Sequence, residues 1–183
     1  SQLGQLYVFE NLNIISFLIF NISLIIMGLV LSMFYINFFY LFKLEFKHNF
    51  ILKLLLFFGV ISGFCFSGVG IFPTDIAFKY HIFFADTAFY SLLVVSIIQT
   101  YIIFKSNFLS NQYSMGYLIF CIFLVFYVRL LIFGGDPSIG MPKGYYQSNH
   151  VLSQKLIVLT ILIATLHQTL GIRKFLNDKE INY

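Results

Sequence analysis

Five long apolar runs constrain this chain more than any other feature of its sequence. A helix needs about 20 residues to cross a hydrocarbon core about 30 Å thick, and the runs are close to or above that length. They cover residues 14–42, 51–72, 82–104, 116–133 and 151–172. A membrane β-barrel would need many shorter segments of alternating polarity. The sequence therefore predicts an all-α polytopic transmembrane bundle, with residues 1–183 forming a single integral membrane domain.

The composition excludes an ordinary water-soluble domain. Of the 183 residues, 60% are hydrophobic and only 10% are charged, whereas a soluble domain has about 25% charged residues. The net charge of +4 comes from cations scattered between apolar runs, so a nucleic-acid partner is not expected. Cys65 and Cys121 lie inside apolar runs, which predicts buried thiols rather than a disulfide.

The distribution of basic residues predicts an orientation. If the loops alternate sides, the cations of one face are Lys43, Lys47, Lys53, Lys105, Arg173, Lys174 and Lys179, and the other loops hold Lys79 and Lys143. By the positive-inside rule, the lysine-rich face and the C-terminus are cytoplasmic, and Ser1 is on the exterior side. Because the sequence starts at Ser1 with no Met and no signal-like n-region, and this start is predicted to be exterior, we expect a sixth transmembrane helix ahead of it, with a cleaved signal as the alternative.

Ionisable residues inside the spans need an explanation, because each costs roughly 2.5–3.5 kcal/mol on insertion scales. Asp86 and Arg129 lie about one helical turn from the exterior ends of the third and fourth spans. Their similar depth makes an ion pair feasible. Such a pair would be an interhelical clamp or part of a binding site, and Arg129 has the further option of snorkelling to lipid headgroups.

The fifth span carries a polar stripe. His150, Gln154, Thr165 and Gln168 project within roughly 60° of one another on a helix, so this seam is expected to face other helices and to form interhelical hydrogen bonds. Lys155, near the exterior interface, is expected to extend its amine toward the headgroups.

Small residues on the second span predict a close helix contact. Gly59, Gly63 and Ser67 are spaced four apart and line one helix face. We expect the first span to approach this face through Gly28 and Ser32.

The turn after the second span and its surroundings supply further polar groups. Pro73 is predicted to end the helix, and Thr74 or Asp75 to bond to local backbone amides. The candidate ligand-binding residues of the exterior layer are Asp75, His81, Asp86, Arg129, His150, Gln154 and Lys155.

A metal site is a weaker alternative for part of this layer. Two imidazoles and a carboxylate can hold Zn²⁺, which activates water for hydrolysis, so the metal candidates are His81, Asp86 and His150. However, His81 and Asp86 diverge by about 140° on a helix and no paired-histidine helix motif occurs. No firm metal site and no cofactor are predicted.

Several segments together resemble a known family. These are Ser1-Gln2-Leu3-Gly4 ahead of a span with Phe20-Asn21 and Gly28, the Gly-x-Phe-Pro-x-Asp turn at residues 70–75 followed by His81, and Gln154-Lys155 in place of a Gln-Arg pair. The pattern is similar to the prokaryotic domain-of-unknown-function family nine-nine-eight, which is distantly similar to the eukaryotic DRAM and Frag group. The resemblance implies six helices, no established activity, and a link to lipid or lipid-anchor handling.

Three functions follow as alternatives. The first is a protein that binds or handles membrane lipid through a polar pocket near the exterior leaflet. The second is a structural or accessory subunit of a larger membrane complex, or a homo-oligomer, that packs through its small-residue face and aromatic surface. The third is a membrane-embedded, metal-dependent lipid hydrolase, although an enzyme is not the favoured class.

Overall fold

The computed structural model describes residues 3–46, 50–133 and 143–180, and gives the backbone alone for residues 133, 143–151, 179 and 180. The chain divides into two compact units, Ser1–Val95 and Ser96–Tyr183. The third helix contributes residues to both units.

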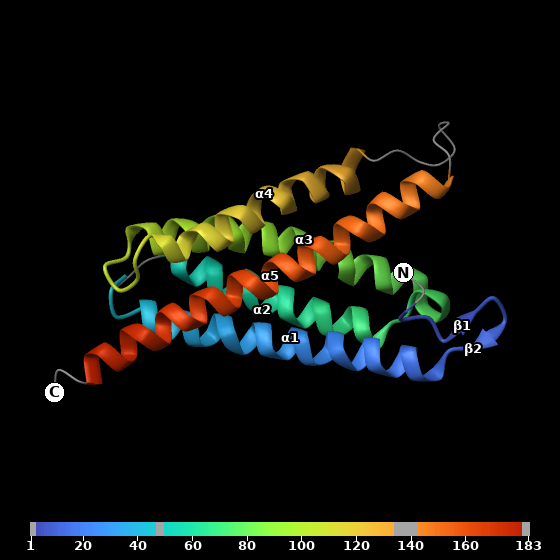
Figure 1. Ribbon diagram of the computed structural model, residues 1–183, viewed down its shortest axis with the longest axis horizontal. Helices are drawn as coiled ribbons and strands as arrows, with labels where there is room; N and C mark the ends of the chain where they lie inside the picture. The colour runs from blue at the N-terminus through green and yellow to red at the C-terminus, as the bar shows by residue number, and fades with distance from the viewer. Residues whose placement is uncertain (1–2, 47–49, 134–142, 181–183) are drawn as a thin grey trace. The chain divides into compact units, whose positions relative to one another are not determined.

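Five helices make up almost all of the described chain (Figure 1). They are α1 (Ile14–Phe42), α2 (Phe50–Ile71), α3 (Thr74–Lys105), α4 (Gln112–Phe133) and α5 (Lys143–Glu180). Each contains a segment long and apolar enough to cross a membrane. The all-α prediction is therefore confirmed, and the five apolar helices mark the chain as an integral membrane protein.

The helices differ from the predicted spans chiefly at their ends. α1 has the predicted bounds and α2 agrees to within one residue, whereas α4 starts at Gln112 rather than at residue 116. α5 covers Lys143–Glu180 instead of 151–172, so His150 lies within a helix and not in the preceding loop. Apolar runs mark only the part of a helix that crosses the hydrocarbon, and α5 continues beyond that part at both ends.

The predicted spans 51–72 and 82–104 leave residues 73–81 as a connection, and this prediction is wrong. Only Phe72 and Pro73 separate α2 from α3, and the amides of Ile76 and Ala77 bond to the carbonyl oxygen of Pro73. Proline is compatible with the start of a helix, because the first helical amides have no partner within the helix. Ala77 has non-helical backbone angles (φ −138°, ψ 50°), so α3 is kinked one turn after its start.

In the first unit, α1 and α2 pack closely through small residues, as the sequence predicts. A Cβ atom added to Gly28 would collide with the carbonyl oxygen of Gly63, and one added to Gly63 would collide with the hydroxyl of Ser32. Ser67 also donates a hydrogen bond across this contact to the carbonyl oxygen of Ile25, at 3.2 Å. The backbones therefore approach too closely for any larger residue at the two glycines.

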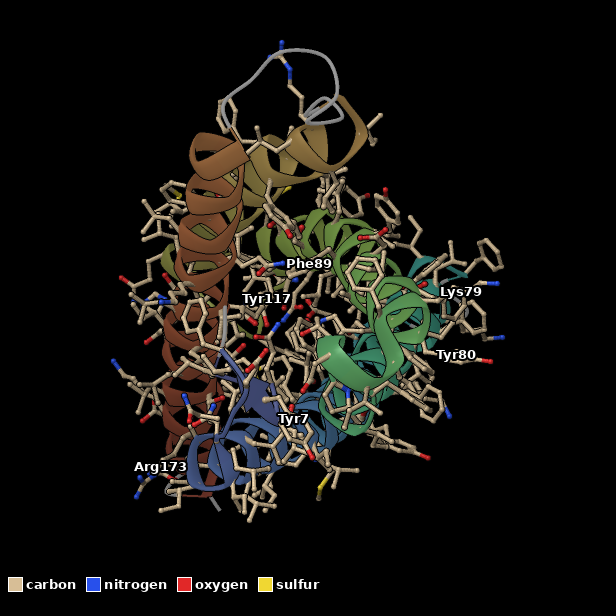
Figure 2. All side chains as sticks on the ribbon, turned by 90° about the vertical axis from the view of Figure 1, so that its right-hand side faces the viewer. Tyr7, Lys79, Tyr80, Phe89, Tyr117 and Arg173 are labelled. Carbon is tan, nitrogen blue, oxygen red and sulfur yellow. The ribbon has the colours of Figure 1, made fainter. Side chains whose placement is uncertain are left out.

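Aromatic rings join α2 to the first half of α3. Phe72 stacks on Phe84 with ring centroids 5.4 Å apart, and Phe66 meets Phe89 edge to face at 5.8 Å. Figure 2 shows Phe89 in the interior of this unit and Lys79 and Tyr80 at its outer surface. The interior cysteine of α2, Cys65, is a buried free thiol as predicted.

The second unit is built on the antiparallel pair of α4 and α5. Tyr117, Phe120 and Leu124 from α4 are fully buried, and Ile157 and Ile161 from α5 are buried as well. Figure 2 shows Tyr117 in the interior of this unit and Arg173 at its outer surface. Cys121 on α4 is also a free thiol, but it is only half-buried.

Candidate functional site

The segment before α1, residues 3–13, folds back along the first turns of that helix, and we call it the N-terminal strap. Three side chains hold its backbone. Asn21 donates to the carbonyl oxygen of Gly4 at 3.1 Å, Ser16 to that of Leu3 at 3.1 Å, and Asn13 to that of Gln5 at 3.2 Å. The side chain of Asn21, on an otherwise apolar helix face, is thereby explained as a support for the strap.

Asp75 fastens the strap to α3. One carboxylate oxygen accepts hydrogen bonds from the amides of Leu6, at 2.7 Å, and Tyr7, at 3.0 Å. Beside it, Gln5 donates to the hydroxyl of Thr74 at 3.3 Å. The predicted bonding of Thr74 or Asp75 to local amides is therefore not what the structure has. Because Pro73 leads directly into α3, both side chains lie on its first turn and meet a segment far away in sequence.

His81 lies half-buried on α3 and closes the turn between the two helices. Its Nδ1 is 2.8 Å from the carbonyl oxygen of Phe72. A carbonyl oxygen only accepts, so Nδ1 carries the proton in this contact. Asp86, also half-buried, lies further along α3 in the same unit.

The second unit contains a ladder of polar contacts between α4 and α5. Gln154 donates to the hydroxyl of Tyr127 at 2.9 Å, and the hydroxyls of Tyr117 and Thr165 are 3.0 Å apart. From the first contact to the second, α4 runs back ten residues and α5 runs forward eleven residues, which is the register of an antiparallel helix pair. Gln168 continues the ladder by donating to the carbonyl oxygen of Tyr113 at 3.2 Å.

These contacts confirm that the polar seam of the fifth span faces another helix. Gln154, Thr165 and Gln168 all bond to α4, and Ile161 between them is buried. The side chain of His150, the fourth member of the predicted seam, lies outside the described residues. The side chain of Gln154 therefore bonds α5 to α4 rather than facing an open pocket.

A buried amide pair lies at one end of the ladder, and sequence reasoning singled out Gln168 but not its partner Gln99. Gln99 donates to the side-chain oxygen of Gln168 at 2.5 Å, and both residues are 0% exposed. The side-chain oxygen of Gln99 has no partner among the described residues. The available signal was an amide within the third span, which in a bilayer needs a partner.

Among the candidate residues of this unit whose side chains the structure describes, Arg129 and Lys155 are the two that are exposed. The antiparallel register of the ladder places Arg129 level with Leu152, and Lys155 level with Phe126. Three residues of helix separate these two levels, a distance of about 4.5 Å. In the apolar runs of the sequence, Arg129 lies four residues before the end of the run 116–133, and Lys155 lies four residues after the start of the run 151–172.

The remaining predictions for the exterior layer stay open. Asp86 belongs to the first unit and Arg129 to the second, so their ion pair stays a prediction. Among the residues that the structure describes, no group of three histidine, cysteine, aspartate or glutamate side chains could hold a metal ion. His81 and Asp86 therefore belong to no such group, while the side chain of the third metal candidate, His150, is outside the described part.

Comparison with models of known families finds no match for this chain. Curated proteins and solved structures likewise give no match. The resemblance to domain-of-unknown-function family nine-nine-eight accordingly stays a prediction. The sequence and the five apolar helices identify the chain as an integral membrane protein, with two exposed cations at nearly one level of α4 and α5.

Proposed function

We propose that the protein binds an anionic lipid headgroup near the exterior leaflet through Arg129 and Lys155. The observation that carries this proposal is the position of the two cations, which are exposed and separated by about 4.5 Å along the axis of the α4–α5 pair. The proposal keeps two of the seven ligand-binding residues expected from the sequence. Asp75, His81 and Gln154 already have protein partners at hydrogen-bond distance.

The energetic cost of a charge in hydrocarbon supports a headgroup ligand. An exposed arginine within an apolar span extends its side chain to the interface, where lipid headgroups present phosphate groups. Arg129 offers a planar fork that bonds two phosphate oxygens, and Lys155 adds a compact point charge. The hydrogen bond between Tyr127 and Gln154 fixes the register of the helices at this level. Alternation of the spans assigns this end of the pair to the exterior side.

The other two functions have less support from the described residues. Gly63 and its neighbouring small residues, which the accessory-subunit hypothesis offers to a partner, are already packed against α1 within this chain. The hydrolase hypothesis needs a metal cluster, and the candidate carboxylate and imidazole of α3 do not form one with other described residues. A kinship with family nine-nine-eight, which we also propose, adds a lipid-related context.

Native mass spectrometry of lipid retention tests this function. The protein is purified in mild detergent, mixed with equal amounts of phosphatidylglycerol and phosphatidylcholine, and compared with Arg129→Gln and Lys155→Gln. At about 1 kcal/mol per cation near an anionic surface, each substitution should lower the preference for phosphatidylglycerol about fivefold. Arg173→Gln, which removes an exposed cation eighteen residues further along α5, is the matched control.

The comparison between the variants decides the outcome. A preference lost in Arg129→Gln and Lys155→Gln but kept in Arg173→Gln supports the proposal. An unchanged preference in both test variants contradicts it, and so does an equal loss in the control, because either result removes the special role of the α4–α5 level.

A further inference from the structure

The N-terminal strap contains a small β-hairpin with a strained turn. Its strands are β1 (Tyr7–Val8) and β2 (Asn11–Leu12), with Tyr7 opposite Leu12 and Val8 opposite Asn11. The turn residues Phe9 and Glu10 both have positive φ angles, 48° and 66°. Two-residue hairpin turns of this kind favour Asn-Gly, because the left-handed conformation is sterically unfavourable for other L-residues such as Phe9 and Glu10.

Packing within the chain does not offset that strain. Phe9 is 83% exposed, and Tyr7 and Leu12 are also exposed. The hairpin thus presents one large aromatic residue at its tip and two apolar side chains at its base, with Glu10 as the only charge. Transfer of such aromatic and aliphatic side chains out of water lowers the free energy.

Contacts at the base hold the hairpin in a defined position. Asp75 binds the amides of Leu6 and Tyr7, and the amide of Asn13 donates to the carbonyl oxygen of Leu6 at 2.8 Å. The base of the hairpin is therefore closed within the strap and fixed to the first turn of α3. Figure 1 shows β1 and β2 projecting beyond the N-terminal end of α1.

The exposed surface of the hairpin continues into that of a membrane-spanning helix. α1 starts at Ile14, directly after the hairpin, and has no charged residue along its length. Its exposed face near this end is aliphatic and consists of Ile14, Ile15, Leu18, Ile19 and Ile22. A helix with such a face lies against acyl chains, so the hairpin adjoins the N-terminal end of a lipid-facing surface.

We propose that this hairpin inserts Tyr7, Phe9 and Leu12 into the interfacial region of the leaflet at the N-terminal end of α1. Aromatic side chains favour that region, and the hydrated headgroups can meet the polar edges of the strands and the carboxylate of Glu10. Since residues 7–12 carry no cation, insertion requires no anionic lipid. This surface is independent of the headgroup function proposed for Arg129 and Lys155.

The absence of tryptophan makes the inference directly testable. The chain has no tryptophan, so Phe9→Trp gives a single-tryptophan protein. It is reconstituted into phosphatidylcholine vesicles whose acyl chains carry bromine at a shallow or a deep position. Shallow bromine should quench the fluorescence of the introduced tryptophan more strongly than deep bromine, and aqueous acrylamide should quench it weakly. Leu29→Trp, at an exposed position near the middle of α1, should show the opposite order of bromine quenching.

Two results would overturn the proposal. Strong quenching by acrylamide with none by brominated lipid would place the hairpin in water. Protection from both quenchers would place it against protein, including a second copy of the chain. Leu12→Trp tests the same surface without altering the strained turn, and the expected order of quenching is the same. Adding Arg129→Gln and Lys155→Gln to the Phe9→Trp protein should leave the quenching unchanged, so failure of the headgroup proposal would not affect this one.

Discussion

Asp75 illustrates how single polar residues act in this chain. Its carboxylate lies at an exposed position of α3, yet it holds two amides of a segment nearly seventy residues earlier in the sequence. Spacing along the chain could not identify those partners, because nothing local distinguishes an aspartate that bonds its own turn from one that bonds a distant strap. Gly63 is the opposite case, since its spacing from neighbouring small residues predicted its contact with α1.

Replacing Asp75 should loosen the strap. In Asp75→Ala the amides of Leu6 and Tyr7 lose a charged acceptor worth about 1–3 kcal/mol, so their hydrogen exchange should accelerate about tenfold or more. Asp75→Asn keeps one side-chain oxygen and should have a smaller effect. Exchange measured by mass spectrometry on peptides covering residues 3–13 checks this, with peptides from α5 as the internal control. Equal exchange in wild-type and Asp75→Ala strap peptides would show that the two hydrogen bonds do not hold the strap.

Enlarging Gly63 should separate α1 from α2. The new methyl group of Gly63→Ala would collide with the backbone of Gly28 and the hydroxyl of Ser32, so we expect a loss of about 1–3 kcal/mol in the free energy of unfolding. Gly116→Ala is the matched control, because its Cβ would lie 3.3 Å from the Cα of Ala164 and needs only a small adjustment. Denaturation in detergent micelles measures both variants. A larger loss for Gly116→Ala than for Gly63→Ala would contradict the close packing described.

At the scale of the elements, polar contacts set the register of α4 against α5. The hydrogen bonds of Tyr127 with Gln154 and of Tyr117 with Thr165 follow nearly the same antiparallel register along both helices. Helical periodicity predicted the α5 side of this seam but not its partners, because tyrosines on an aromatic-rich helix give no separate signal. The starts of α3 and α5 were missed for another reason. Lys79 and the polar residues before Val151 are typical of loops, whereas both helices continue outside the apolar run.

The buried amides test this register energetically. Gln168→Leu removes the acceptor of Gln99 and the donor to Tyr113, so it should cost about 1–2 kcal/mol by leaving buried polar groups unpaired. Adding Gln99→Leu should restore part of that loss, since the orphaned amide is then removed. Thr169→Val, an exposed residue that bonds within its own helix, should be nearly neutral. Strictly additive losses in the double variant would show that the two amides are not coupled.

At the scale of the whole molecule, the account depends on five membrane crossings. Length and apolar composition predicted these helices almost completely, because the demand of a hydrocarbon core is set by the solvent and not by distant contacts. The candidate site was less predictable. Depth along each span could be read from the sequence, but which polar groups bond within the protein and which stay exposed depends on packing. Gln154 and Arg129 were expected in one pocket, but Gln154 bonds to Tyr127 within the protein and Arg129 stays exposed.

The central claim is best tested by the sidedness of two cysteines. In a background of Cys65→Ser and Cys121→Ser, Lys79→Cys and Asn177→Cys are labelled separately with a membrane-impermeant maleimide. Both positions are exposed, and the orientation predicted from the sequence puts the first outside and the second in the cytoplasm. Lys79→Cys should react in intact cells, and Asn177→Cys only after lysis. Labelling of both from the same side would contradict five crossings, and a reversed pattern would contradict the exterior position assigned to Arg129 and Lys155.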